Sequence, residues 1–135
     1  MNDTDRLKIV KHMVESYMAG DFAPIAAAMS ETIAIRLTVG PGTPLSGTFR
    51  GPEQVGEYFA RNAEAVDTNE MKVLNYLAGG NQVAVTGRET LTIKKSGRVV
   101  KDSDWVMLCT FTDDKISEIV IIEDMTELAN AYAVP

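Results

Sequence analysis

The segment from Asn81 to Asp124 constrains the fold most, because its alternating pattern predicts three long, adjacent β-strands. Side chains of a strand alternate between its two faces, so every second residue from Val83 lies on the same face. In the first strand these residues are Val83, Val85, Gly87, Glu89, Leu91 and Ile93. Ser96-Gly97 and residues 112–115 provide the turns. The segment therefore predicts a curved antiparallel sheet.

The other two strands of this segment carry inner rows of the same kind. The return strand places Trp105, Met107, Cys109 and Phe111 on one face, and the last strand places Ile119, Ile121 and Glu123 there. Glu89 and Glu123 are therefore carboxylates in rows that are otherwise apolar. Burial among apolar side chains raises the pKa of a carboxylate, which favours general acid or base chemistry near neutral pH. We expect this face of the sheet to hold a site.

The composition excludes several classes of function. The 135 residues are enough for one domain, 1–135, but not for two. No apolar run approaches the roughly 20 residues that span a bilayer, and the polar N-terminus lacks the pattern of a signal peptide, so we expect a cytoplasmic protein without a membrane partner. A net charge of −6 argues against a nucleic-acid partner. His12 and Cys109 are the only residues of their types, so we expect no metal site, and no glycine-rich phosphate loop points to a cofactor.

The remaining segments predict helices and two more strands. Apolar residues at three- and four-residue spacings predict an amphipathic helix over residues 4–19, a shorter helix after Asp21, and a third from Gly51 to Val66. Alternation predicts strands over Ile33–Val39 and Met71–Ala78. The resulting order, α-α-β-α-β-β-β-β with a short helix expected at the end, is an α+β fold with helices on one face of an antiparallel sheet.

Three short motifs, in their order and spacing, are specific enough to indicate a particular fold. They are Gly20-Asp21-Phe22, the run Pro-Leu-Ser-Gly-Thr-Phe-Arg-Gly at residues 44–51, and Asp114-Lys115-Ile116 leading to Ile122-Glu123-Asp124. On these motifs the chain resembles a SnoaL-like member of the nuclear-transport-factor-2-like superfamily, the group that contains ketosteroid isomerase. The resemblance covers essentially the whole chain and implies a cone-shaped α+β barrel with a pocket between the curved sheet and the helices.

The resemblance also implies dimerisation through the outer face of the sheet, and the residues agree with it. The outer rows of the last two strands contain Val106, Leu108, Val120 and Ile122. Four large aliphatic side chains left in water would form an unfavourable patch, and covering each one is worth roughly 1.5–3 kcal/mol. We therefore expect a homodimer through the outer sheet face.

The enzymes of this superfamily mostly use pocket carboxylates and bound water, without metal, for isomerisation, cyclisation, dehydration or epoxide opening. Their best-known catalytic residues do not match this sequence. The base of ketosteroid isomerase falls at Leu37 and its donor acid at Met107, while the strand acid of the epoxide hydrolases falls near Ile121. The resemblance thus implies chemistry of this general kind without assigning those activities.

We expect Glu89 and Glu123 to be the catalytic groups, and each has an alternative interpretation. Glu89 would be a structural acid if it paired with Arg88, Arg61 or a backbone donor. Glu123 would only face water if it lay at the mouth of the pocket. The neighbouring Asp124 is better explained as a cap of the final helix.

The expected substrate-binding residues point into the same inner space. Trp105 and Met107 would shape a pocket for a flat, apolar ligand, from which Leu37 would exclude water. Tyr17 and Tyr58 project from helices, where a hydroxyl would either orient a carbonyl or anchor a helix to the sheet. The full set is Trp105, Met107, Leu37, Tyr17, Tyr58, Cys109 and Ile121.

Two classes of function fit these expectations. The first is a cofactor-independent isomerase, cyclase or lyase that acts by acid–base chemistry on a small, hydrophobic, carbonyl-bearing or polyketide-like molecule. The second is a non-catalytic ligand-binding or dimerisation module of the same fold. A desolvated acid in a well-formed pocket favours the enzyme, whereas the missing catalytic residues of known relatives favour the module.

Overall fold

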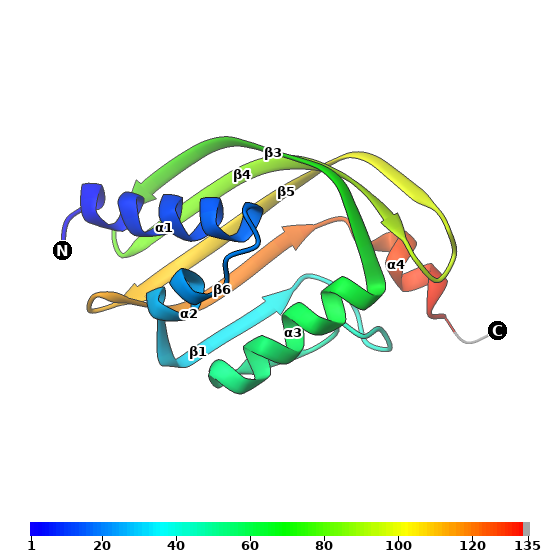
Figure 1. Ribbon diagram of the computed structural model, residues 1–135, viewed down its shortest axis with the longest axis horizontal. Helices are drawn as coiled ribbons and strands as arrows, with labels where there is room; N and C mark the ends of the chain where they lie inside the picture. Colours follow the sequence, from blue (N-terminus) through cyan, green and yellow to red (C-terminus); the bar gives the residue numbers. More distant parts are fainter. Residues whose placement is uncertain (134–135) are drawn as a thin grey trace.

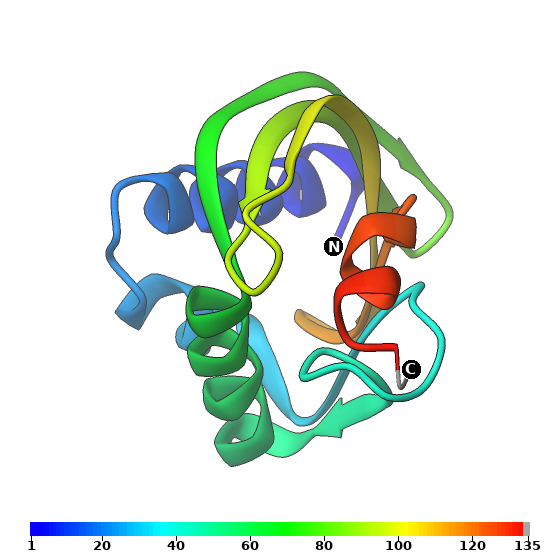
Figure 2. The ribbon, with the colours of Figure 1, turned by 90° about the vertical axis from the view of Figure 1, so that its right-hand side faces the viewer.

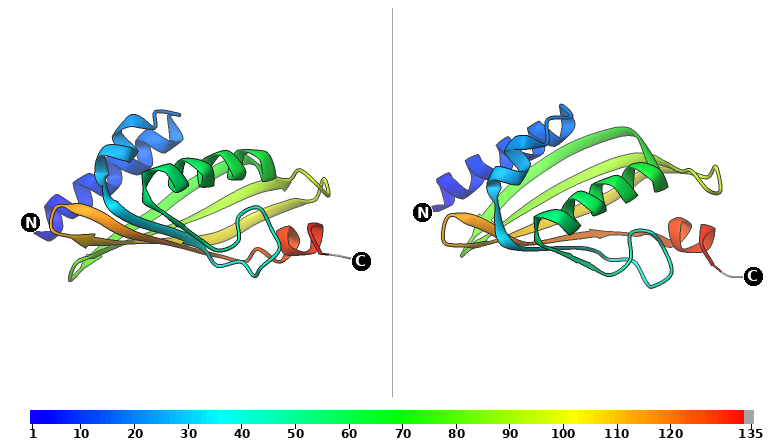
Figure 3. Two further views of the ribbon diagram at one scale, coloured as in Figure 1. Left: turned by 90° about the horizontal axis from the view of Figure 1, so that it is seen from below. Right: turned by 60° about the horizontal axis from the view of Figure 1, so that its bottom comes forward.

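A computed structural model describes residues 1–133 of the chain. Three helices lie along the concave face of one curved sheet, and a fourth helix follows the last strand (Figures 1 and 3). The elements are α1 (Asp3–Met18), α2 (Ala23–Ala28), β1 (Met29–Leu37), β2 (Thr48–Arg50), α3 (Gly51–Ala65), β3 (Val66–Gly79), β4 (Gln82–Ile93), β5 (Val99–Thr112), β6 (Lys115–Glu123) and α4 (Thr126–Ala131).

The six strands form one sheet in the order β2-β1-β6-β5-β4-β3. The α+β class and the three long strands β4, β5 and β6 are confirmed. The sheet is mixed rather than antiparallel, because β1 runs parallel to β6 while all other neighbours are antiparallel. It also stays open between β2 and β3 instead of closing into a barrel, although it is strongly curved (Figure 2).

Three strand expectations differ from the structure. Strand β1 runs from Met29 to Leu37, and not from Ile33 to Val39. Strand β3 begins at Val66, directly after α3, and not at Met71, because polar residues that break the apolar alternation still pair with β4, as Asp67 does with Thr92. Strand β2 was not predicted, since three residues are too short to show a period. Its pairing with β1, Phe49 opposite Ile35, extends the sheet beyond the strands that alternation reveals.

Helices α1 and α3 are positioned by local signals that the sequence contains. Asn2 and Asp5 form a reciprocal capping box at the start of α1, and Gly20, with φ of 76°, follows its end. Pro52 lies in the first turn of α3, where a missing N–H costs nothing. The buried side chains of the two helices, such as Met13 and Tyr58, face the sheet and enclose the space described next.

Candidate functional site

A cavity of about 150 Å³ lies between the concave face of the sheet and helices α1, α2 and α3. Its walls are largely apolar. Eight of the nine residues that the sequence predicts for the site line this cavity: Glu89, Glu123, Trp105, Met107, Leu37, Tyr17, Tyr58 and Ile121. Inward rows on four different strands, together with two helices, therefore bring these side chains to one space.

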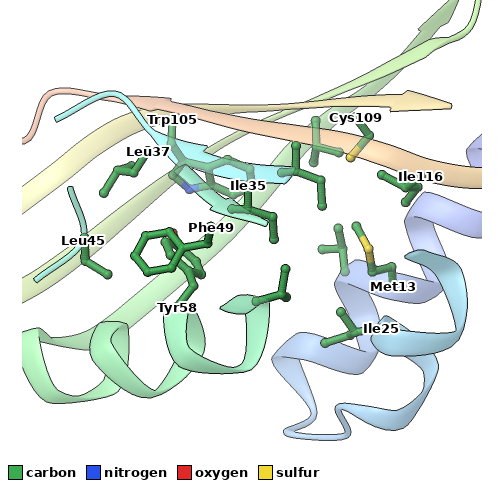
Figure 4. Close-up of a cluster of buried hydrophobic side chains, with 14 of the residues drawn as sticks. Met13, Ile25, Ile35, Leu37, Leu45, Phe49, Tyr58, Trp105, Cys109 and Ile116 are labelled. Atoms are coloured by element: carbon green, nitrogen blue, oxygen red, sulfur yellow. The ribbon is translucent and has the colours of Figure 1, made fainter. Parts of the chain in front are cut away.

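Cys109 is the predicted ligand-contact residue that the structure places elsewhere. Its side chain is fully buried beside Ile116, at the end of the sheet that α1 and α2 cover, and it does not line the cavity (Figure 4). Burial alone raises the pKa of the Cys109 thiol to about 12, so the group stays protonated and inert. The strand row was predicted correctly, but the cavity opens along only part of that row.

Several cavity residues were not predicted as part of the site. Phe59 and Asn62 lie on α3 and were not among the residues predicted to bind a ligand. Thr68 and Met71 come from β3, whose first residues were not expected to be a strand. Asn62 and Thr68 add neutral polar groups to a wall that is otherwise apolar apart from the predicted residues.

The two glutamates meet across β5. Glu89 on β4 lies opposite Ser103 of β5, while Glu123 on β6 lies opposite Trp105 of the same strand. The two carboxyls are within hydrogen-bonding reach of each other. Figure 1 shows β5 between the two strands that supply them. The pair is therefore made by long-range strand register and not by proximity in sequence.

Both carboxyls prefer to hold a proton. Desolvation raises the pKa of Glu89, and desolvation together with the negative charge of Glu89 raises the pKa of Glu123. Two carboxylates this close and this dry do not both ionise readily, so they titrate as a pair that keeps one proton above the usual range. The hydroxyl of Ser103 offsets part of this rise in the pKa of Glu123. Oε2 of Glu123 is buried without a hydrogen-bond partner, and a proton shared within the pair meets that need.

The alternative interpretations of these acids are not supported. Arg88 turns to the outer face and binds Asp104 at 2.9 Å, and Arg61 contacts Glu57 at 3.9 Å. In the described part of the chain, Glu89 forms no ion pair. Glu123 is 9% exposed and does not face bulk water.

Asp124, by contrast, faces water but is not the cap that was expected: Met125 is the N-cap of α4, and Asp124 lies one residue before it. Its carboxylate accepts a hydrogen bond from the backbone N–H of Thr126, at the start of α4, at 3.0 Å. Hydrogen bonds from Thr126 lower the pKa of Asp124 below its ordinary value. Neighbouring residues in one sequence motif therefore hold opposite protonation preferences, because one side chain faces the cavity and the other faces water.

Trp105 lies flat against the sheet beside the glutamates. Its indole covers Gly87, its partner on β4, so closely that a Cβ there would be 2.1 Å from Cζ2 and 2.4 Å from Cε2 of the ring. The side chain is 7% exposed, and its Nε1 is buried without a hydrogen-bond partner. Glycine at position 87 is thus required for the indole to lie where it does.

Aromatic side chains form the helical side of the cavity. Tyr17 and Tyr58 lie 5.9 and 5.7 Å from Phe59, measured between ring centroids, and the half-exposed Phe22 lies 5.6 Å from Phe59. Burial, then the charges of Tyr17 and the two glutamates, raises the pKa of Tyr58. Its hydroxyl therefore remains a neutral donor at physiological pH.

This arrangement can hold a small apolar molecule and exchange a proton with it. Within residues 1–133 there is no group of three histidine, cysteine or acidic side chains that could hold a metal ion. In the same residues, none of the helices has the length and apolar character needed to cross a membrane. The chemistry available at this site is that of a carboxyl pair, two phenols and an indole N–H.

Comparison with known proteins places this geometry among related folds. The model of the SnoaL-like domain matches residues 10–119. A search of curated proteins gives no match. An NTF2-like protein from Burkholderia xenovorans is 26% identical, with a TM-score of 0.81 over 98% of this chain and 99% of its own. A Mesorhizobium loti protein provisionally named a SnoaL-like polyketide cyclase is 25% identical, with a TM-score of 0.70 over 84% of this chain and 95% of its own. TerC, crystallised with polyporic acid, is 18% identical, with a TM-score of 0.77 over 95% of this chain and 98% of its own.

Proposed function

This chain belongs to the SnoaL-like domain family, and we propose that its cavity binds a small, flat, apolar molecule and moves a proton next to a carbonyl group of that molecule. The observation that carries the proposal is the pair formed by Glu89 and Glu123 inside an apolar cavity. Related proteins support the general class, since one carries a provisional cyclase name and TerC, of similar fold, was co-crystallised with polyporic acid.

The pair supplies both groups that enolisation needs. The ionised carboxylate removes a proton from the carbon next to the carbonyl, and the protonated carboxyl donates a hydrogen bond to the carbonyl oxygen as negative charge develops there. Returning the proton to a different atom gives isomerisation, and using the enolate as a nucleophile gives cyclisation. No cofactor is consumed in either case.

The cavity limits the size and polarity of the substrate. A volume of about 150 Å³ is that of an engineered apolar cavity known to hold benzene. Aromatic rings on α3 and the indole of Trp105 favour a flat molecule between them. The proposed substrate therefore carries a ring or a short apolar skeleton with one carbonyl directed at the glutamates.

Deuterium exchange tests proton transfer without knowledge of the natural substrate. The probe is 2-indanone, a flat apolar ketone with acidic protons beside its carbonyl, followed by NMR in D₂O. The protein should accelerate exchange, and Glu89→Gln or Glu123→Gln should slow the accelerated exchange by about 100-fold or more. Glu118→Gln, on the outer face of β6, is the matched control and should leave the rate unchanged.

Two results would decide against this mechanism. Exchange that is equally fast in wild type and in both glutamine variants would remove the carboxyl pair from the chemistry. Binding of 2-indanone with no accelerated exchange would favour the alternative, a non-catalytic ligand-binding module of this fold.

We also propose that the chain forms a homodimer through the outer face of the sheet. Leu77, Ala84, Leu108 and Val120 lie opposite one another in one row across four strands. Leu77 is 58% exposed and Ile122, in the next row, is 46% exposed, so large apolar side chains face outward on this side of the sheet. Ala84 and Leu108 are partly exposed, whereas Val120 is only 7% exposed within one copy of the chain. A second copy of the chain would cover this face.

Light scattering coupled to size-exclusion chromatography tests this assembly. Ile122→Lys should convert a dimer to a monomer, because it places a charge among the exposed apolar side chains of this face. Met18→Lys replaces an equally exposed apolar side chain on α1 and should leave the mass unchanged. A monomeric wild-type protein would contradict the proposal.

A further inference from the structure

One donor in the cavity wall is left without an acceptor. The indole of Trp105 lines the cavity, yet its Nε1–H is buried and unpaired. An indole nitrogen only donates, and buried donors in folded proteins are almost always satisfied. The other two orphaned polar atoms in residues 1–133 are Oε2 of Glu123, at the same site, and Nε of Arg6, whose side chain already binds Gly80 and Asp3 through its Nη1. The unmet donor of Trp105 therefore points to a ligand.

The position of the ring is fixed by the fold. Cε2, the ring carbon bonded to Nε1, lies where a side chain at position 87 would clash at 2.4 Å. Trp105 is thus pressed against the backbone of β4 at Gly87, with Glu123 directly opposite on its other neighbour, β6. Opposite residues on paired strands have Cβ atoms about 5 Å apart, so the indole and the carboxyl pair border the same part of the cavity.

We propose that the Nε1–H of Trp105 donates a hydrogen bond to the oxygen of the ligand's carbonyl group. The inference rests on the proposed function, whose substrate it defines further as a molecule with an exposed acceptor oxygen at the end that meets Glu123. The protonated carboxyl and the indole then form two donors around one oxygen. As charge develops on that oxygen, both hydrogen bonds strengthen, so the indole contributes to the transition state as well as to binding.

Trp105 is the only tryptophan in the chain, which gives this donor a unique signal. In ¹⁵N-labelled wild-type protein the indole N–H is a single resonance, and two probes of nearly the same shape are compared. 2-Indanone carries a carbonyl, whereas indane does not. We expect 2-indanone to move the indole proton downfield and to slow its exchange with solvent. Indane should bind in the cavity without either effect.

A variant measures the affinity that the hydrogen bond provides. Trp105→Phe keeps an aromatic ring but removes the donor, so the dissociation constant of 2-indanone should rise about tenfold. That of indane should change less than about threefold, because indane has nothing to accept a hydrogen bond. Equal losses for both probes would mean that Trp105 acts by packing alone and would overturn the proposal.

The wild-type experiment does not depend on the stability of any variant. An indole resonance that responds equally to both probes, or to neither while other cavity resonances shift, would overturn the proposal.

The same experiments distinguish failure of this proposal from failure of the proposed function. If the protein accelerates deuterium exchange but the indole resonance does not shift, proton transfer is supported and the role of Trp105 is rejected. If 2-indanone shifts the indole resonance but its deuterium exchange is not accelerated, the hydrogen bond from Trp105 is supported and catalysis is rejected. Absence of binding by either probe up to its solubility limit would overturn both.

Discussion

The two ends of the inner face of β5 have the same strand pattern and opposite properties. At one end Cys109 is fully buried and Phe111 is 2% exposed, and Figure 4 shows Cys109 beside Ile116, with Met13 of α1 and Ile25 of α2 on the facing side. At the other end Trp105 and Met107 face an open cavity that also contains two acids. Alternation determines which side chains point inward, but the layer packed above determines whether they become a core or a site.

The difference also shows in how polar groups are treated. The packed end holds apolar side chains and a thiol that stays neutral. The open end keeps a buried carboxyl oxygen and an indole N–H without protein partners. Such groups cost stability unless a ligand or a shared proton satisfies them, so they make this end of the sheet the candidate site.

The largest contrast is expected from matched isoleucines on β6. Ile116 is fully buried at the packed end, whereas Ile121 is partly exposed in the cavity wall. Ile116→Ala should lower the free energy of unfolding by about 2–5 kcal/mol, because it leaves a new void in a close-packed region. Ile121→Ala should cost about 1–2 kcal/mol, because its side chain already borders empty space. Urea unfolding of both variants measures the difference, and equal costs would mean that the two ends are packed alike.

Two glycines provide the second contrast. A Cβ at position 87 would collide with the indole of Trp105 and lie 2.5 Å from the carbonyl oxygen of Lys72, so Gly87→Ala should lower the free energy of unfolding by about 2–3 kcal/mol. Gly56, inside α3, has open space around it, and Gly56→Ala should raise that free energy by about 0.5–1 kcal/mol. Thermal unfolding and the emission of the single tryptophan check both. If Gly87→Ala is as stable as wild type, the close contact does not exist in solution.

The smallest effect concerns the dependence of stability on pH. Both glutamates have pKa values raised in the folded protein, so between the ordinary carboxyl pKa and the raised one the folded state binds more protons than the unfolded state. The free energy of unfolding should therefore fall, by about 1–2 kcal/mol, as the pH rises from 5 to 8. Glu123→Gln should flatten this slope, while Glu118→Gln should keep it. A stability that rises over this range would contradict a protonated pair.

Much of this site follows from the sequence, because strand alternation places Glu89, Trp105, Met107 and Glu123 on one face. What alternation does not contain is the register between distant strands. The meeting of Glu89 with Glu123 depends on how β4 and β6 each align with β5. The parallel pairing of β1 with β6 is likewise set by tertiary contacts and not by a local signal.

Two other features were beyond sequence reasoning for a different reason. Gly87 reads as one more small residue of an inner row, and only the position of the Trp105 ring shows why a side chain is excluded there. Cys109 was expected to contact the ligand because it shares a row with Met107. The cavity is lined by Met107 and not by Cys109, a boundary that strand alternation alone does not reveal.

The most direct test of the account is a titration of the two carboxyls. Glutamate labelled with ¹³C at the side-chain carboxyl, with assignments from Glu89→Gln and Glu123→Gln, gives the pKa of each group by NMR between pH 3 and 9. We predict that the pair loses its first proton at low pH and keeps the second to neutral pH or above, with each variant changing the titration of the remaining acid. Two independent titrations in the ordinary range of exposed glutamates would contradict a proton-sharing site at the open end of the sheet.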